Sequence, residues 1–549
     1  MPISPTAGPP LTGTGGAPPY DHAGEASRVA WPDVVVGARR LNRKTAVVAS
    51  AGPVETPGTA GAREAVKARL FTTTLAVDSP VVELGWPTHG PFVLGPSGVY
   101  FDGYLGVAQK LLDEHHPRFT KMVADLTAAD VLLRREIATD DFLVAREGSP
   151  VKTPTDLATL WNATMQARWA RPDGWRAFFS SSGTEAVEAA LKLAYEVAYK
   201  RFLAAFGHDT FAAVQTELGH RVVPYFDRDP SLRDHPVYDD YPFQVVACES
   251  SFHGRTLGSL QLTRSKRAHQ LGYPKARNVH HVPYNAPGDP VRALVDWRGI
   301  REILAIPGEL ARVVRGARRI PKDLLAAFVA EPFQGEGGYV AGKPAFFEAA
   351  RRVCDESGAL LCVDEVQSVA RTGRLFATEH LGVRPDIVST AKGMVIGVTL
   401  AGADLETHLH GGWHSNTWGA GRVLDVNYAW TVLDTLLHHR EPAFAGMSYL
   451  ENETEKGRRL EAALDRLATK HPTLVVSHRG LGLMRGVVVR RREAIVHEAW
   501  LRGLKLLGCG YAGESSVIRV LFLADTLSRE IDEFERVLDG VLTAVSATR

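Results

Sequence analysis

Three residues with chemically capable side chains follow short apolar runs of the sequence, namely Glu331, Asp364 and Lys392. Enzymes use lysine amines and carboxylates in covalent and acid–base catalysis. In open parallel sheets, ligands bind beyond the carboxyl ends of the strands, so these side chains are expected to meet at one edge of a sheet. Any one of them could simply mark the point where a strand returns to water. The three together favour an active site.

A second segment could bind a phosphate group. The letters SSSGTEA at residues 180–186 follow two phenylalanines and precede an apolar helical pattern. Free backbone N–H groups at the start of a helix bind phosphate, and Gly183 would allow a close approach. Ser182 and Glu185 also spell a capping box, which needs no ligand. When the segment is taken alone, the cap is the simpler interpretation.

A third segment places an aromatic ring and a cation beside a turn. The letters FHGRT at residues 252–256 follow an apolar strand pattern at residues 245–247. A core aromatic residue beside a surface arginine would explain this segment when it is considered alone.

The elements around these residues alternate between strand and helix. Strands are predicted at 328–330, 360–363 and 387–389, and apolar residues at 346, 349, 350 and 353 lie on one face of a helix between the first two. This order is a βαβ unit, and continuous apolar strands are typical of parallel sheets that are covered on both faces. The predicted fold class is α/β, with a large domain built on a mainly parallel sheet and a smaller α+β domain formed by the N- and C-terminal parts.

The chain is too long for one hydrophobic core, because single cores stop growing at roughly 250 to 300 residues. Residues 1–61 are rich in Pro, Gly and Ala and are predicted to be a mostly disordered extension. Residues 62–160 would form the N-terminal part of the small domain, 161–440 the large domain, and 441–549 the C-terminal part of the small domain. A long helix at 451–469 followed by short strands motivates the last boundary.

Composition narrows the classes of protein that remain. The chain is 45% hydrophobic and 23% charged, which is typical of folded proteins, and its formal net charge is +1. Neither a nucleic acid nor an anionic membrane surface is therefore expected as a partner. The four cysteines show no disulfide framework or zinc-ligand spacing, and no export signal or membrane-spanning run is evident. We expect a cytoplasmic protein without a bound metal.

Five motifs in the same order resemble those of the class III, fold type I aminotransferases, which use pyridoxal 5'-phosphate. The resemblance covers roughly residues 90 to 540, and Lys392 lies 28 positions after Asp364, as the pattern requires. The matching stretches are SSSGTEAVEAALKLA, SFHGRTLGSLQLT, FVAEPFQGEGG, LLCVDEVQSVARTGRLFATEHLGVRPDIVSTAKG and SNTWGAGRVLDV. Five motifs in order make a chance match untenable.

The resemblance implies a role for each matching residue. Lys392 forms a Schiff base with the cofactor aldehyde and then moves protons, while Asp364 keeps the pyridine nitrogen protonated so that the ring acts as an electron sink. The other implied contacts are Phe252 and Val366 on the two ring faces, Gln367 at the ring oxygen, Gly183 and Thr184 at the phosphate, and Thr417 at the phosphate of the neighbouring subunit. The last contact implies a homodimer with a shared active site.

The resemblance also suggests the substrates, because relatives that act on terminal amines use a pair of arginines. The pattern is similar to the lysine 6-aminotransferase and 4-aminobutyrate aminotransferase branch. In such relatives the arginine at the position of Arg255 binds the donor carboxylate. The second arginine corresponds to Arg519, and in such relatives the glutamate at the position of Glu336 masks it until 2-oxoglutarate binds. The expected reaction moves a terminal amino group from a donor like lysine, ornithine or 4-aminobutyrate to this oxo acid.

Two alternatives remain open at this point. Aminomutases, epimerases and decarboxylases share the lysine, the aspartate and the phosphate loop, although the paired Glu336 and Arg519 favour transamination. A non-catalytic scaffold could also keep the fold, but the presence of Lys392 together with Asp364 counts against it.

Overall fold

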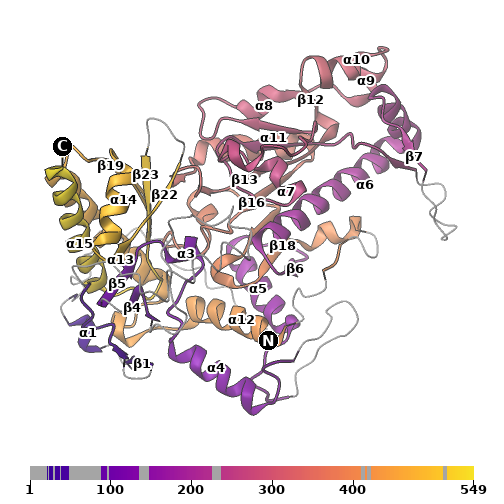
Figure 1. Cartoon of the computed structure of the whole chain (residues 1–549). Coiled ribbons are helices and arrows are strands. Elements are labelled where there is room, and N and C mark those ends of the chain that lie inside the picture. Colours follow the sequence, from indigo (N-terminus) through magenta and orange to yellow (C-terminus); the bar gives the residue numbers. More distant parts are fainter. Residues whose placement is uncertain are drawn as a thin grey trace, which may run out of the picture.

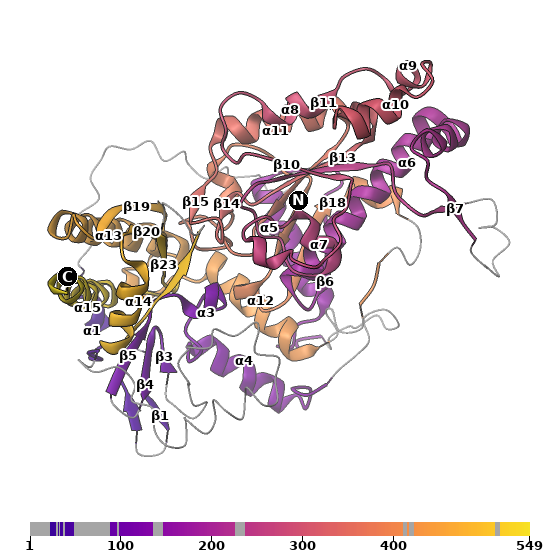
Figure 2. The ribbon, with the colours of Figure 1, turned by 45° about the horizontal axis from the view of Figure 1, so that its top comes forward.

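The computed structural model describes residues 88–95, 98–134, 147–224, 236–409, 414–416, 422–510 and 516–548, together with residues 22, 24–28, 31, 33–36 and 39–48. Figure 1 shows two groups of elements, a larger one around a long sheet and a smaller one that contains the C-terminal helices. The described residues of the N-terminal segment lie beside those C-terminal helices in both Figure 1 and Figure 2.

The larger group is built on a seven-stranded sheet whose order is β10-β9-β13-β16-β17-β18-β6. Only β18 runs antiparallel to its neighbours in this sheet, so the predicted mainly parallel sheet is confirmed. The bounds are β6 (Trp175–Ser180), β9 (Gln244–Cys248), β10 (Val279–Val282), β13 (Leu325–Ala330), β16 (Leu360–Asp364), β17 (Ile387–Thr390) and β18 (Gly397–Gly402).

Helices cover both faces of this sheet, which explains why its central strands are apolar on both sides. The long helix α6 (Gly183–Glu217) packs on one face. The other face is covered by α5 (Pro154–Arg168), α11 (Pro344–Ser357) and α12 (Val423–His438). In α11 a proline opens the first turn, and Gly358 ends the helix in the left-handed conformation at φ 73°.

The smaller group contains a four-stranded antiparallel sheet packed against three helices. The strands are β19 (Val475–Leu481), β20 (Met484–Val489), β22 (Leu507–Cys509) and β23 (Ser516–Leu521), and the helices are α13 (Tyr449–Lys470), α14 (Arg492–Leu501) and α15 (Ser528–Ala547). Within the described residues, no helix of either group is long and apolar enough to cross a membrane.

A second small sheet joins the two ends of the chain. The C-terminal strand β21 (Leu504–Lys505) pairs in parallel with β5 (Gly98–Asp102), and β4 (Phe92–Gly95) and β3 (Thr88–His89) continue that sheet. Phe92 and Phe101 from this sheet are fully buried against C-terminal side chains. The prediction that N- and C-terminal segments together form the smaller unit agrees with this pairing, whereas the boundaries at residues 160 and 440 remain a prediction.

Part of the segment predicted to be disordered is folded onto the C-terminal helices. It forms α1 (Glu25–Arg28), β1 (Val34–Val36) and β2 (Arg39–Leu41). The Arg43 guanidinium is 1% exposed and donates to Asp525 at 3.2 Å, to Glu530 at 3.0 Å and to Asp113 at 3.4 Å. The Pro- and Gly-rich composition that motivated the prediction is concentrated before residue 21, outside the described residues. The average composition of residues 1–61 is dominated by this first part, so it did not indicate the apolar residues that follow residue 21.

Candidate active site

Lys392 lies in a tight turn directly after β17. The turn η7 (Lys392–Met394) begins with Lys392 at φ 50°, a backbone conformation that side chains other than glycine rarely adopt and that often marks functional sites. A Cβ atom on Gly393 would lie 2.2 Å from the Leu111 Cγ, so only glycine fits there. Burial, together with the charge of Arg519, lowers the pKa of Lys392 to about 8. A large share of this amine is therefore neutral and nucleophilic in mildly alkaline solution.

Asp364 is the last residue of β16 and forms a buried pair with His253. Asp364 pairs in register with Ser389 of β17, three positions before Lys392. Its Oδ2 lies 2.8 Å from the His253 Nδ1, and the Val366 N–H donates to its Oδ1 at 3.0 Å. Burial lowers the pKa of His253, but the hydrogen bond and charge of Asp364 outweigh it and the pKa is raised overall. Sequence reasoning overlooked His253, although it lies inside the FHGRT motif.

Glu331 holds two of the predicted segments together. It follows β13, and its two carboxylate oxygens accept hydrogen bonds from the Phe252 N–H at 2.8 Å and the Gly335 N–H at 3.2 Å. Burial raises the pKa of Glu331 to about 7. The third strand-end residue therefore positions the aromatic ring of Phe252 and the QGEGG loop.

The start of α6 lies close to the ends of β16 and β17. A Cβ atom on Gly183 would lie 2.6 Å from the Val366 Cγ1 and 3.3 Å from the Ala391 Cβ, so this helix end, the residue after β16 and the residue before Lys392 converge. The Ser182 hydroxyl accepts from the Glu185 N–H at 3.4 Å, which is one of the two hydrogen bonds of the predicted capping box, whereas the Glu185 carboxylate accepts from the Ser181 N–H at 2.6 Å. The Thr184 hydroxyl lies 2.8 Å from the Ser259 hydroxyl.

The residues present fit pyridoxal 5'-phosphate. Two buried donors, the Gln367 Nε2 and the His253 Nε2, have no hydrogen-bond partner among the described residues. An unpaired buried donor costs about 1–3 kcal/mol, and a bound polar group would remove that cost. The helix end at Gly183 suits a phosphate, and the Lys392 amine suits an aldehyde. Gln367 also explains Gly335, because a Cβ atom there would overlap the Gln367 Oε1 at 1.2 Å.

Glu336 and Arg519 form the predicted ion pair, although they are 183 residues apart. The Arg519 Nη2 donates to the Glu336 Oε1 at 2.8 Å, and Arg519 is 1% exposed. Burial alone would raise the pKa of Glu336, but the charges of Arg519 and Lys266 lower it to about 2. The Arg519 Nε and Nη1 have no hydrogen-bond partner in the described part of the chain. Two of the three nitrogens of this buried guanidinium are thus unpaired within the described residues.

Lys266 is a further cation at this pair that sequence reasoning missed. Its Nζ lies 3.1 Å from the Glu336 Oε2, on the oxygen that Arg519 does not use. The only sequence signal is its place in the TRSK letters that follow the FHGRT motif, within a loop that has no periodicity.

Arg255 is exposed and contacts His269, three residues after Lys266. Its Nη2 lies 3.1 Å from the His269 Nε2, and its guanidinium carbon lies 6.0 Å from the centre of the Phe252 ring. No carboxylate of the described residues forms an ion pair with it. Thr417 lies outside the described residues, but its neighbour Asn416 donates to the Phe179 carbonyl at the end of β6 at 3.0 Å.

Known proteins that are similar to this chain act as aminotransferases. Its residues 94–541 match the profile of the family described as aminotransferase class-III. An acetylornithine aminotransferase of Gloeobacter violaceus is 28% identical over 460 residues, which cover 82% of this chain and 90% of the relative. A putrescine aminotransferase of Pectobacterium atrosepticum is 30% identical over 344 residues, which cover 60% of this chain and 58% of the relative.

Solved structures agree with this assignment. A lysine aminotransferase from M. tuberculosis, solved in its internal aldimine form, superposes with a TM-score of 0.64 at 25% identity and covers 89% of this chain and 99% of its own. The family profile spans most of the chain, including every predicted site residue. The chain therefore belongs to the class III aminotransferases, enzymes that depend on pyridoxal 5'-phosphate.

Proposed function

We propose that this enzyme moves a terminal amino group from a donor like lysine, ornithine or 4-aminobutyrate to 2-oxoglutarate. The observation that carries the proposal is the presence of two different arginines in one chain. Arg519 is buried and paired with Glu336, whereas Arg255 is exposed and forms no ion pair with a carboxylate of the described residues. Two arginines, of which one is masked, suit an enzyme that binds two ligands of different length in turn. Bidentate arginine–carboxylate contacts are strong and geometrically selective.

The roles of the cofactor-binding residues complete this proposal. When bound, pyridoxal 5'-phosphate supplies an electron sink for the carbanion of the substrate. The Lys392 amine holds the aldehyde group and carries the proton between two carbons, and Asp364 with His253 supplies the charge at the ring nitrogen. The remaining contacts fall to Phe252 and Val366 on the ring, Gln367 at its oxygen, and Gly183, Thr184 and a second subunit's Thr417 at the phosphate. We propose a homodimer on the basis of this shared contact, and a cytoplasmic location as the sequence analysis predicts.

The ion pair acts as a gate between the two half-reactions. While Glu336 neutralises Arg519, a donor is held by Arg255 alone and presents its distal amine. When the pair opens, Arg519 takes the α-carboxylate of 2-oxoglutarate or glutamate. An exposed ion pair contributes only about 0–1 kcal/mol, too little to direct a substrate choice, but this guanidinium is buried.

Separate variants of the gate should shift the two half-reactions in opposite directions. In Glu336→Ala, Arg519 is always unmasked, so we expect the rate with glutamate to rise relative to the rate with the terminal-amine donor. In Arg519→Ala, the half-reaction with 2-oxoglutarate should slow by roughly 10–100-fold more than that with the donor, because a charged hydrogen bond contributes about 1.5–3 kcal/mol. Single-turnover rates with lysine, 4-aminobutyrate, glutamate and 2-oxoglutarate measure both effects.

The exposed ion pair of Arg176 and Glu406, at 3.0 Å, supplies the matched control. Alanine at either position should change neither half-reaction. Equal slowing of both half-reactions in the two gate variants would contradict the gate. Turnover of the donor without any oxo acid would instead identify a mutase, an epimerase or a decarboxylase and would overturn the proposed function.

Removing the carboxylate of Asp364 should impair chemistry more than cofactor binding. We expect Asp364→Ala to lower the single-turnover rate by roughly 100–1,000-fold, by analogy with the loss of one preorganised charge or donor at a developing charge. Visible absorption should show that the variant still holds the cofactor, with a shifted band. Asp404→Ala, which removes a carboxylate at the surface of the large domain, is the control. A normal rate in Asp364→Ala would remove this residue from the mechanism.

A further inference from the structure

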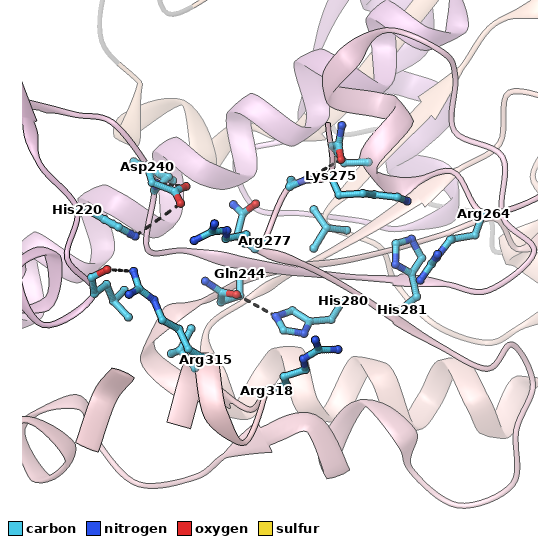
Figure 3. Close-up of a pocket in the computed structure, with 17 residues that line it drawn as sticks. His220, Asp240, Gln244, Arg264, Lys275, Arg277, His280, His281, Arg315 and Arg318 are labelled. Carbon is cyan, nitrogen blue, oxygen red and sulfur yellow. Dashed lines mark hydrogen bonds and ion pairs between the residues drawn. The ribbon is translucent and has the colours of Figure 1, made fainter. Parts of the chain in front are cut away.

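A pocket lined by basic residues lies at the β10 edge of the large sheet (Figure 3). Its volume is about 660 Å³, within the range of pockets that hold small molecules. None of the residues assigned above to the active site lines it. One wall comes from the segment between residues 203 and 244, through Leu218, His220, Asp240, Tyr241 and Gln244. The family reaction gives this segment no role.

The charge of this basic pocket is strongly positive. One carboxylate, Asp240, lines it together with five cations, namely Arg264, Lys275, Arg277, Arg315 and Arg318. Lys275 donates to the Gln270 side chain and Arg315 to the Leu218 carbonyl, which are both uncharged acceptors. Arg264 lies 3.8 Å from the Glu249 carboxylate, which does not line the pocket, whereas neither Arg277 nor Arg318 forms an ion pair in the described part of the chain. Figure 3 shows Arg277, Arg315 and Arg318 around the same opening.

Three histidines in the pocket have lowered pKa values, for which burial is the main cause and the neighbouring cations a smaller one. Burial and then the charge of Arg318 lower the pKa of His280, and burial and then Arg264 lower the pKa of His281 to about 4. Burial also lowers the pKa of His220, and Arg315 adds to this against the opposing charge of Asp240. Cations that line one pocket repel one another, so an anion that enters the pocket relieves the repulsion.

The predominance of arginine among the five cations indicates which kind of anion suits the pocket. Four of the five cations are arginines, whose planar forks match phosphate oxygens in pairs. Leu218, Tyr241, Val279 and Val314 add uncharged surface to the lining of the pocket. We propose that the basic pocket binds a small anion with at least two linked phosphate groups, either an inorganic polyphosphate or a nucleoside polyphosphate.

Calorimetric titration of the cofactor-loaded enzyme at about 150 mM salt tests this site, because the cofactor then fills the other phosphate site. Inorganic tripolyphosphate, ATP and citrate are the probes, and we expect one tripolyphosphate per chain to bind at least tenfold more tightly than citrate. The double variant Arg277→Gln, Arg318→Gln should weaken that binding tenfold or more. Both side chains are exposed and without ion pairs in the described residues, so an unchanged melting temperature will show that the variant folds.

The matched control is Arg352→Gln with Arg490→Gln, two exposed arginines that do not line the pocket. Equal affinity for ATP and tripolyphosphate would assign the site to the phosphate chain alone, and tighter binding of ATP would assign it to a nucleotide. The proposal is overturned if tripolyphosphate and ATP both fail to bind, if citrate binds as well as they do, or if the control variant weakens binding as much as the pocket variant does.

Discussion

Replacing Lys392 with alanine is expected to lower turnover by roughly four orders of magnitude or more, in line with the loss of a covalent catalytic group. The reason lies in the position of this amine. It lies on a strained turn beyond β17, near the carboxylate that ends β16, and its lowered pKa makes it a ready nucleophile. Alanine would remove the group proposed to act as covalent partner and proton carrier, and we expect the fold around it to stay intact.

The measurement that checks this assignment does not depend on activity. Borohydride reduction of the loaded wild-type enzyme should leave the cofactor on the peptide that contains Lys392, as detected by mass spectrometry. Lys392→Ala should carry no such label, and added methylamine should restore part of its turnover by replacing the missing amine. The exposed Lys121 serves as the control position for the same substitution. A label on any other lysine would refute the assignment.

Arg43→Ala should lower the free energy of unfolding by about 3–5 kcal/mol, because it leaves buried carboxylates without their cation. Asp113, Asp525 and Glu530 surround this guanidinium, and all three are almost inaccessible to water. Urea denaturation of the loaded enzyme measures the loss.

Arg40 offers a control three residues away. Its ion pair with Asp33 is 74% exposed on the arginine side, and exposed pairs contribute about 0–1 kcal/mol. We expect Arg40→Ala to change the unfolding free energy by less than about 1 kcal/mol. If Arg43→Ala were equally mild, the N-terminal segment would contribute little to the stability of the fold.

Local patterns predicted the central sheet and the residues at its strand ends. The apolar runs before Asp364 and Lys392 are long enough to specify buried strands, and the parallel topology then brings their ends to one edge. His253 and Lys266 were missed for a different reason. Their roles depend on contacts with Asp364 and Glu336, each from a distant part of the chain, and no periodicity in the sequence encodes such contacts.

The pairing of Glu336 with Arg519 could be predicted only through family resemblance. The residues around Arg519 depart from the usual family pattern. The sequence of β23 predicts an apolar strand and gives no indication of a partner for its arginine. Register in the C-terminal sheet decides where this guanidinium lies, since Arg519 pairs with Gly486 on one side and Leu507 on the other. The prediction of disorder for residues 1–61 was wrong in part for a related reason. Composition contains no information about a helix from a distant part of the chain that packs on this segment.

The cluster around Arg43 can form only after the ribosome has synthesised Asp525 and Glu530. Arg43 precedes Asp525 by 482 residues, so roughly 25 to 100 s pass between their appearances if a ribosome adds about 5–20 residues per second. During that interval the N-terminal segment and the strands that contain Phe92 and Phe101 lack the helix that buries them. A nascent chain that stalls before α15 therefore leaves Arg43 without Glu530 and exposes the apolar surface that α15 covers, and exposed apolar surface is a feature by which chaperones and proteases recognise unfinished proteins.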